Sequence, residues 1–242
     1  MLKAEQLVGH RGWPAHYPEN TLPGFMAACK EGALFLECDI QLSADGIPMV
    51  IHDEDLARVA GKPVRVRDLN FDELKTIPVT QDHHSALEPG EYIPLSLKEL
   101  FQVLEAYPHV SLFVEIKRHS LAHFGLRKTC DIILRECAHF PNRVMIISFR
   151  ADAIEYVQQN SNYPVGWILR EWSDDSRQMA EHLKPEFLFV EQAMVNISQE
   201  VLWPGTWRWV LYDIIDPALA SAWVKRGASM VVTWDIKALL EH

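Results

Sequence analysis

The sequence has few cysteines, no paired cysteine motif and no long apolar run. Four of its 242 residues are cysteines, and none forms a CxxC pair: Cys29, Cys38, Cys130 and Cys137. This pattern argues against a disulfide framework and predicts reduced thiols in the core. The longest apolar runs, such as Met145 to Ile147, are far too short to span a bilayer.

The sequence also lacks an excess of positive charge. Lysine and arginine number 23 against 33 acidic residues, which gives a net charge of −10. This balance argues against binding to nucleic acid or to an acidic membrane face, but a metal or a local cation cluster can still attract an anionic substrate. The N-terminus shows no basic segment followed by an apolar one. We therefore expect a cytoplasmic protein without a stable membrane anchor, as a monomer or homodimer.

Short apolar runs rich in strand-forming residues alternate with helical patterns along the chain, which predicts a parallel sheet covered by helices. The predicted strands are Leu7-Val8, Leu34 to Ile40, Pro48 to Ile51, Ser111 to Ile116, Val144 to Ser148, Val165 to Leu169, Phe187 to Val190, Trp209 to Tyr212 and Met230 to Thr233. The predicted helices are 20–31, 97–106, 121–138, 151–159, 174–183, 198–203, 216–226 and 235–241.

The second and third of these nine strands are too close in sequence for a parallel crossover. Only Gln41 to Ile47 separates them, so they are expected to form an antiparallel hairpin in which paired residue numbers sum to about 90. The eight remaining strands predict a (β/α)8 TIM barrel in one domain, residues 1–242. Residues 54–94 show weak periodicity and several prolines, and we expect a small inserted subdomain there without a core of its own.

Several acidic residues fall where strands of such a barrel carry their functional side chains. Glu37 and Asp39 are two residues apart and so share one face of a strand, and the same holds for Glu115 and Lys117. Three carboxylates in a barrel interior are costly unless a cation joins them. Oxygen ligands alone favour Mg²⁺ or Ca²⁺ over Zn²⁺.

Two histidines and two cations are expected beside these carboxylates. The hairpin register places His52 next to Cys38, and His10 follows the first strand. Histidine titrates near neutral pH and suits acid–base catalysis, whereas Arg11 and Lys117 suit an anion such as phosphate. Trp13, Trp172, Trp209 and Trp234 lie near strand ends and are further candidates for a pocket wall, as is His16 for its rim.

Taken together, the motifs resemble the glycerophosphodiester phosphodiesterases, whose barrels are related to phosphatidylinositol-specific phospholipase C. The resemblance covers roughly the first 150 residues and rests on these motifs: His10-Arg11-Gly12, Pro18-Glu19-Asn20-Thr21, Glu37-Cys38-Asp39, Asp45-Gly46, His52-Asp53, Arg58, Ile93-Pro94, Glu115-Ile116-Lys117 and Ser148-Phe149.

The resemblance implies a role for each matching residue. Glu37, Asp39 and Glu115 correspond to metal ligands, His10 and His52 to the acid–base pair, Arg11 and Lys117 to phosphate contacts, and Glu19 and Asn20 to a supporting loop. The implied reaction is hydrolysis of a glycerophosphodiester to glycerol 3-phosphate and an alcohol. In the family mechanism, a glycerol hydroxyl attacks phosphorus first, and water then opens the cyclic phosphate.

The C-terminal third departs from the family pattern in two places near the glycerol or alcohol end of the pocket. The expected Trp-x-x-Asn strand end has its counterpart in Trp209 followed by Val210 to Asp213, and the late Thr-Asp is here interrupted by Trp234. Substrate choice is therefore left open. One alternative is a lysophospholipase D with an apolar groove built from Phe71, Leu87 and Tyr92, and another is a non-catalytic binding protein on the same fold.

Overall fold

The computed structural model describes residues 2–79, 92–140, 142–198 and 201–240. Eight of their strands pair in parallel as a closed ring, in the order β1 (Leu7–Gly9), β11 (Met230–Thr233), β10 (Arg208–Tyr212), β9 (Phe187–Glu191), β8 (Val165–Ile168), β7 (Val144–Ser148), β6 (Ser111–Ile116) and β2 (Phe35–Leu42), which pairs back to β1. The predicted TIM barrel is therefore confirmed.

The hairpin after the second strand has the predicted register. Strand β3 (Pro48–Val50) runs antiparallel to β2, with Ile40 opposite Val50 and Leu42 opposite Pro48. Gly46 turns the chain with a φ of 81°, and the hydroxyl of Ser43 accepts a hydrogen bond from the backbone N–H of Ile47 at 2.9 Å. This geometry brings the residues that follow β3 beside the C-terminal half of β2.

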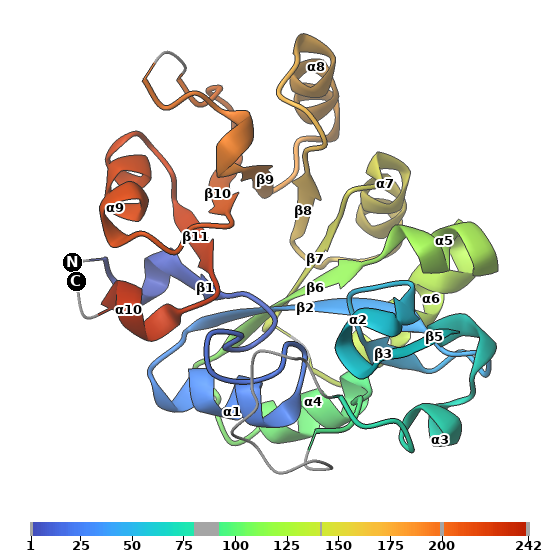
Figure 1. Cartoon of the computed structure of the whole chain (residues 1–242). Helices are drawn as coiled ribbons and strands as arrows, with labels where there is room; N and C mark the ends of the chain where they lie inside the picture. Colours follow the sequence, from blue (N-terminus) through green and yellow to red (C-terminus); the bar gives the residue numbers. More distant parts are fainter. Residues whose placement is uncertain (1, 80–91, 141, 199–200, 241–242) are drawn as a thin grey trace.

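Helices fill the connections and surround the barrel (Figure 1). They are α1 (Leu22–Lys30), α4 (Leu97–Leu104), α5 (Arg118–Phe124), α6 (Leu126–Cys137), α7 (Ala151–Asn160), α8 (Asp174–Leu183), α9 (Pro217–Lys225) and α10 (Ile236–Leu240), with short 3-10 turns η1 (Ala4–Gln6) and η3 (Gln192–Met194). None of the helices within the described residues is long and apolar enough to cross a membrane.

Two helix predictions were wrong. The single helix expected over 121–138 is divided into α5 and α6 at Gly125, whose φ of 87° and ψ of 151° leave the helical region. The helix expected over 198–203 lies partly outside the described residues, and its described part is not helical. Pro204 explains this second difference, because a residue that precedes proline disfavours helical backbone angles.

The strand alternation divides the apolar residues into two layers. The inside of the barrel is filled by a cluster that includes Phe113, whose ring meets those of Phe187 and Phe189 edge to face at centroid distances of 5.0 and 5.3 Å. Cys38 faces outward into the larger layer between strands and helices, as predicted. All four cysteines are buried and free, which confirms the prediction of reduced core thiols.

The described part of the insertion has an apolar cluster of its own, which corrects the prediction that it lacks one. Its elements are β4 (Asp55–Leu56), α2 (Ala57–Ala60), β5 (Lys62–Arg65), η2 (Val66–Asp68) and α3 (Phe71–Leu74), and they lie beside β3 (Figure 1). Leu56, Val66 and Leu74 are buried against Met49 of β3. Weak periodicity is expected here because elements of two to four residues are too short to show it.

Gly12, in the loop after β1, should be the glycine least tolerant of substitution. Its φ is 90°, and a Cβ there would lie 2.9 Å from backbone atoms of Gly24 and Phe25 at the start of α1. We expect Gly12→Ala to lower the free energy of unfolding by about 2–4 kcal/mol through backbone strain and a clash with rigid backbone. Denaturant unfolding measures this. Gly32→Ala is the matched control, because Gly32 has a φ of 96° with no atom within 4 Å of the added Cβ. Equal losses in the two variants would exclude the clash.

Candidate active site

Three carboxylates meet where the middle of β2 lies beside the C-terminal end of β6. Glu37 and Asp39 lie on β2, and Asp39 is in register with Glu115 on β6. All three side chains are buried, and each offers an oxygen within 4.8 Å of the oxygens of the other two. The sequence spacing thus brings together the three residues that were predicted as one group.

Asp39 is held in its ionised form by the cations around it. Lys117 Nζ lies 3.0 Å from Oδ1, Arg11 Nε lies 3.0 Å from Oδ2, and Asn20 donates to Oδ2 at 2.9 Å. Burial opposes the charge, but Lys117 and Arg11 outweigh it and hold the pKa of Asp39 well below its usual range. Lys117 Nζ also lies 2.8 Å from Oε1 of Glu115, and the two acids raise the pKa of this lysine despite its burial.

The negative charge of Glu37 is balanced by far fewer contacts than that of Asp39. Its carboxylate accepts a hydrogen bond at Oε2 from the backbone N–H of Arg11 at 3.3 Å, and His10 Nε2 lies 3.7 Å from the same oxygen. Burial, followed by repulsion from Asp39 and Glu115, raises the pKa of Glu37 well above its usual value, and burial also raises the pKa of Glu115. The three acids therefore carry more negative charge than their neighbours balance, and this donor set fits a hard divalent cation held by Glu37, Asp39 and Glu115.

Binding of Mg²⁺ to this group should weaken as the pH falls. Because the pKa values of Glu37 and Glu115 are raised, protons compete with the metal at a higher pH than they would for ordinary carboxylates. Calorimetric titration with Mg²⁺ between about pH 8 and about pH 5 measures the effect. An affinity that stays constant over this range would contradict the raised pKa values.

His10 sits at the base of the pocket. Its backbone N–H donates to the carbonyl of Thr233 at 2.9 Å, which fixes the start of the loop after β1. Burial and the nearby Arg11 guanidinium lower the pKa of His10 well below its usual value, so the neutral imidazole predominates at neutral pH. A neutral ring nitrogen beside the carboxylates is able to accept a proton.

His52 follows β3 and is positioned by its neighbour in sequence. Its Nδ1 lies 2.6 Å from Oδ1 of Asp53, and Arg58 Nε donates to Oδ2 of the same carboxylate at 2.7 Å. Burial opposes the charge of Asp53, but the hydrogen bonds from His52 and Arg58 lower its pKa. When Nδ1 carries the proton that Asp53 accepts, Nε2 is the ring nitrogen that is free to transfer a proton.

The predicted supporting loop is connected to the insertion through Arg58. Glu19 accepts from Arg11 Nη1 at 3.0 Å and from both Nη atoms of Arg58, at 2.8 and 2.6 Å. Arg58 lies on α2 and also contacts Asp53, so it bridges the loop after β1 and the loop after β3. Arg58 is part of the sequence motifs, but its bridging role depends on how the insertion folds.

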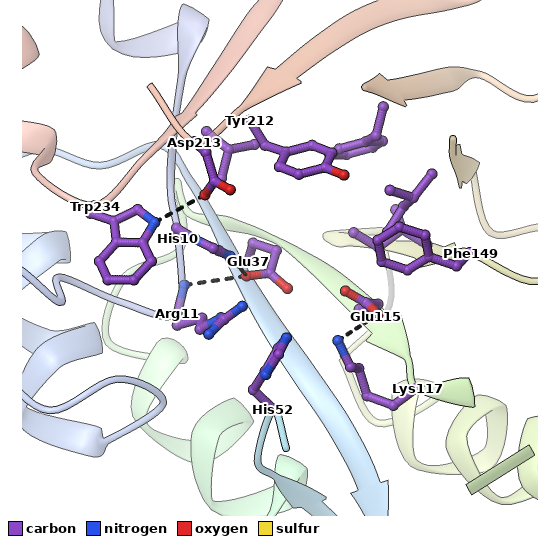
Figure 2. Close-up of a pocket in the computed structure, with 14 residues that line it drawn as sticks. His10, Arg11, Glu37, His52, Glu115, Lys117, Phe149, Tyr212, Asp213 and Trp234 are labelled. Atoms are coloured by element: carbon purple, nitrogen blue, oxygen red, sulfur yellow. Dashed lines mark hydrogen bonds and ion pairs between the residues drawn. The ribbon is translucent and has the colours of Figure 1, made fainter. Parts of the chain in front are cut away.

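A pocket of about 230 Å³ connects these groups (Figure 2). Six of the predicted site residues line it: His10, Arg11, Glu37, His52, Glu115 and Lys117. Asp39, Glu19 and Asn20 lie behind this surface as buried partners. The opposite wall was largely missed from the sequence because it consists of ordinary apolar strand residues and the last residues of late strands: Ile147, Phe149, Ile168, Phe189, Tyr212, Asp213, Val232 and Trp234.

The two departures in the C-terminal third meet at this wall. Trp234 Nε1 donates to Oδ1 of Asp213 at 3.2 Å, and the Trp234 ring lies edge-on to His10 at a centroid distance of 5.7 Å. Trp209, the residue compared with the family's strand-end tryptophan, instead packs outside the barrel, where its Nε1 donates to the carbonyl of Trp203. The strand-end side chain that reaches the pocket from β10 is Tyr212 (Figure 2).

The other tryptophan and histidine candidates lie elsewhere. Trp172 stacks on Trp203 with ring centroids 3.9 Å apart, and Trp13 packs against His16 and donates to Asp235 at 3.0 Å. Neither tryptophan lines the pocket. His16 is 54% exposed beside Asp235 and is likewise absent from the lining.

A second hollow of about 450 Å³ adjoins the pocket, and most of the residues that line it are charged or polar. It shares five residues with the pocket and adds Asp53, Glu54, Arg118, His119, Arg170, Glu191 and Met194. Of the residues considered for an apolar groove that would take a lysophospholipid, Tyr92 is buried in the cluster of the insertion and Phe71 packs against that cluster. Leu87, the third residue considered for the groove, lies outside the described residues.

The barrel and its pocket define an enzyme of the phosphodiesterase class. The chain belongs to the glycerophosphoryl diester phosphodiesterase family, whose model matches residues 10–234. Glycerophosphodiester phosphodiesterase 1 of Bos taurus is 28% identical over 249 residues, which cover 97% of this chain and 72% of that protein. A glycerophosphodiester phosphodiesterase of Bacillus altitudinis is 33% identical over 149 residues, 60% of this chain and 58% of that protein.

Solved structures show the same fold. An Oleispira antarctica phosphodiesterase, solved in complex with the product sn-glycerol-3-phosphate, superposes with a TM-score of 0.85 at 22% identity and covers 98% of this chain and 95% of its own. The glycerophosphodiester phosphodiesterase of Thermotoga maritima gives a TM-score of 0.77 at 25% identity, with 100% and 99% of the two chains covered.

Proposed function

We propose that this protein hydrolyses glycerophosphodiesters to glycerol 3-phosphate and an alcohol, in a reaction that depends on a divalent cation and on His10 and His52. The observation that carries the proposal is the convergence of three buried carboxylates, two histidines and two cations on one pocket of the family's barrel. The chain is proposed to form one domain over residues 1–242. Its cytoplasmic location and its monomeric or homodimeric state remain predictions.

Each side chain has a task that follows from its surroundings. Glu37, Asp39 and Glu115 would hold Mg²⁺ or Ca²⁺, which supplies charge stabilisation to phosphoryl and hydroxyl oxygens when it is bound. Arg11 and Lys117 lie in the pocket wall, and each has one contact with Asp39. Their remaining N–H groups would bind the substrate phosphate. Glu19 and Asn20 hold Arg11 and Asp39 in place.

The two histidines would move the protons. The buried, neutral His10 is suited to accept a proton, and His52 is oriented by Asp53 so that one nitrogen remains free. Two proton-transferring groups in one pocket suit a displacement at phosphorus, since one hydroxyl loses a proton as the leaving oxygen gains one. The same residues argue against the non-catalytic alternative, because none of the predicted catalytic or ligand positions is replaced.

The direct test is release of glycerol 3-phosphate from glycerophosphocholine, glycerophosphoethanolamine and glycerophosphoglycerol. Each is assayed with EDTA and then with added Mg²⁺ or Ca²⁺, and release of choline from lysophosphatidylcholine is measured as a fourth reaction, because its phosphate product keeps the acyl chain. Release that requires the cation supports the proposal. Activity confined to lysophosphatidylcholine would favour the lysophospholipase D alternative, and inactivity on all four substrates would refute the phosphodiesterase proposal.

A further inference from the structure

The charges of the pocket are divided between its two sides. Arg11 and Lys117 lie on one side with the acids that balance them. Asp213 lies on the other side, after β10, and accepts a hydrogen bond from the neutral indole of Trp234. Among the residues that the structure describes, no lysine, arginine or histidine lies within ion-pair distance of Asp213. This pocket carboxylate therefore lacks a cationic partner within the described protein.

One aromatic ring contacts this carboxylate, and two more line the same pocket. Tyr212 precedes it and Trp234 donates to it, and both side chains face the pocket together with Phe149 (Figure 2). Trp234 remains 36% exposed, although burial of so large a side chain would be favourable. A carboxylate among aromatic faces is the chemistry that binds an ammonium group, through charge attraction and the quadrupole of the rings.

We propose that Asp213, Trp234 and Tyr212 bind a positively charged head group, so that the enzyme prefers glycerophosphodiesters of amino alcohols such as choline and ethanolamine. This inference rests on the proposed function. The substrate is a zwitterion, with a phosphate for the cationic side of the pocket and an ammonium group for the Asp213 side. Asp213 is exposed to solvent, and a neutral alcohol in the same place would displace water from its carboxylate without offering a positive charge in return.

The backbone at Asp213 is held in place, and this fixes the position of its side chain. Its φ is 61°, in the left-handed region that aspartate and asparagine adopt more readily than most residues other than glycine, and the next backbone N–H, of Ile214, donates to the carbonyl of Val232 of β11. This hydrogen bond holds the backbone after β10 against β11. Asparagine tolerates this region as well as aspartate does, so Asp213→Asn removes the charge without a new backbone cost.

The test compares substrates that differ in head-group charge. For the wild-type protein, kcat/KM for glycerophosphocholine and glycerophosphoethanolamine should exceed that for glycerophosphoglycerol by about 10-fold or more. Asp213→Asn should lower the first two values by about 10-fold, mainly through KM, and change the third by less than about 2-fold. Asp175→Asn makes the same charge change at an exposed position on α8, outside the pocket, and should leave all three values unchanged.

Equal losses on all three substrates in Asp213→Asn would overturn the inference, as would a wild-type protein without preference for the charged head groups. A binding measurement separates this outcome from failure of the proposed function. Phosphocholine is compared by calorimetry with 3,3-dimethylbutyl phosphate, in which a carbon atom replaces the charged nitrogen. Tighter binding of phosphocholine that Asp213→Asn abolishes supports the inference even without turnover, and equal binding of the two probes by the wild-type protein refutes it.

Discussion

Glu37→Gln should lower kcat/KM for glycerophosphodiester hydrolysis by at least about 1000-fold, because it removes a charged ligand from the group that would hold the divalent cation. Glutamine keeps the shape of the side chain, so the pocket should persist. The assay is release of glycerol 3-phosphate at saturating Mg²⁺. Glu155→Gln, at an exposed position on α7, makes the same change away from the pocket and should retain full activity. A loss of less than about 10-fold would remove Glu37 from the ligand set.

The same variant should be at least as stable as the wild-type protein when no metal is present. Burial raises the pKa of Glu37 in the folded protein, so protonation of this group favours folding at low pH and the benefit is lost as the pH rises through the raised pKa. The glutamine side chain does not ionise, so the stability of the variant relative to the wild-type protein should grow with pH. Melting temperatures in EDTA, measured at about pH 5 and about pH 8, test the sign. A variant that melts well below the wild-type protein at the higher pH would contradict it.

His52→Ala should also abolish turnover, with a loss of at least about 1000-fold, yet leave metal binding largely intact. His52 is 31% exposed and bonded to Asp53, so its removal leaves no large cavity in the barrel. Two measurements are needed: the rate of glycerol 3-phosphate release and the rise in melting temperature caused by Mg²⁺. The rise should persist in the variant, because none of the three carboxylates is changed.

His16→Ala is the matched control for His52→Ala. His16 lies near the loop after β1 but is 54% exposed and outside the pocket lining, so its loss should change the rate by less than about 2-fold. Full activity in His52→Ala would refute the acid–base proposal. His10→Ala should behave like His52→Ala, although only 12% of the His10 side chain is exposed and its removal also costs packing.

The sequence was most informative where a local rule was decisive. The period of two along a strand placed Glu37 and Asp39 inward and Cys38 outward, and the short link to the next strand determined both the hairpin and its register. The break at Gly125 was missed because the apolar pattern continues through it. The cluster of the insertion was missed because Leu56, Val66 and Leu74 lie on elements too short to show a period.

The far wall of the pocket could not be predicted for a different reason. Asp213 and Trp234 are 21 residues apart on neighbouring strand ends, so their hydrogen bond depends on the relative register of β10 and β11. No rule for local sequence contains that register. The early motifs could be grouped without it, since β2 and β6 carry acids whose spacing alone indicated a shared face.

Arg58 connects the insertion to two loops of the barrel. One guanidinium group contacts Glu19 in the loop after β1 and Asp53 beside His52, although it belongs to a small layer with a separate apolar cluster. An insertion of this kind is therefore not an interchangeable module. A graft that omitted the arginine would leave the loops after β1 and β3 without their common support, however well the new segment folded.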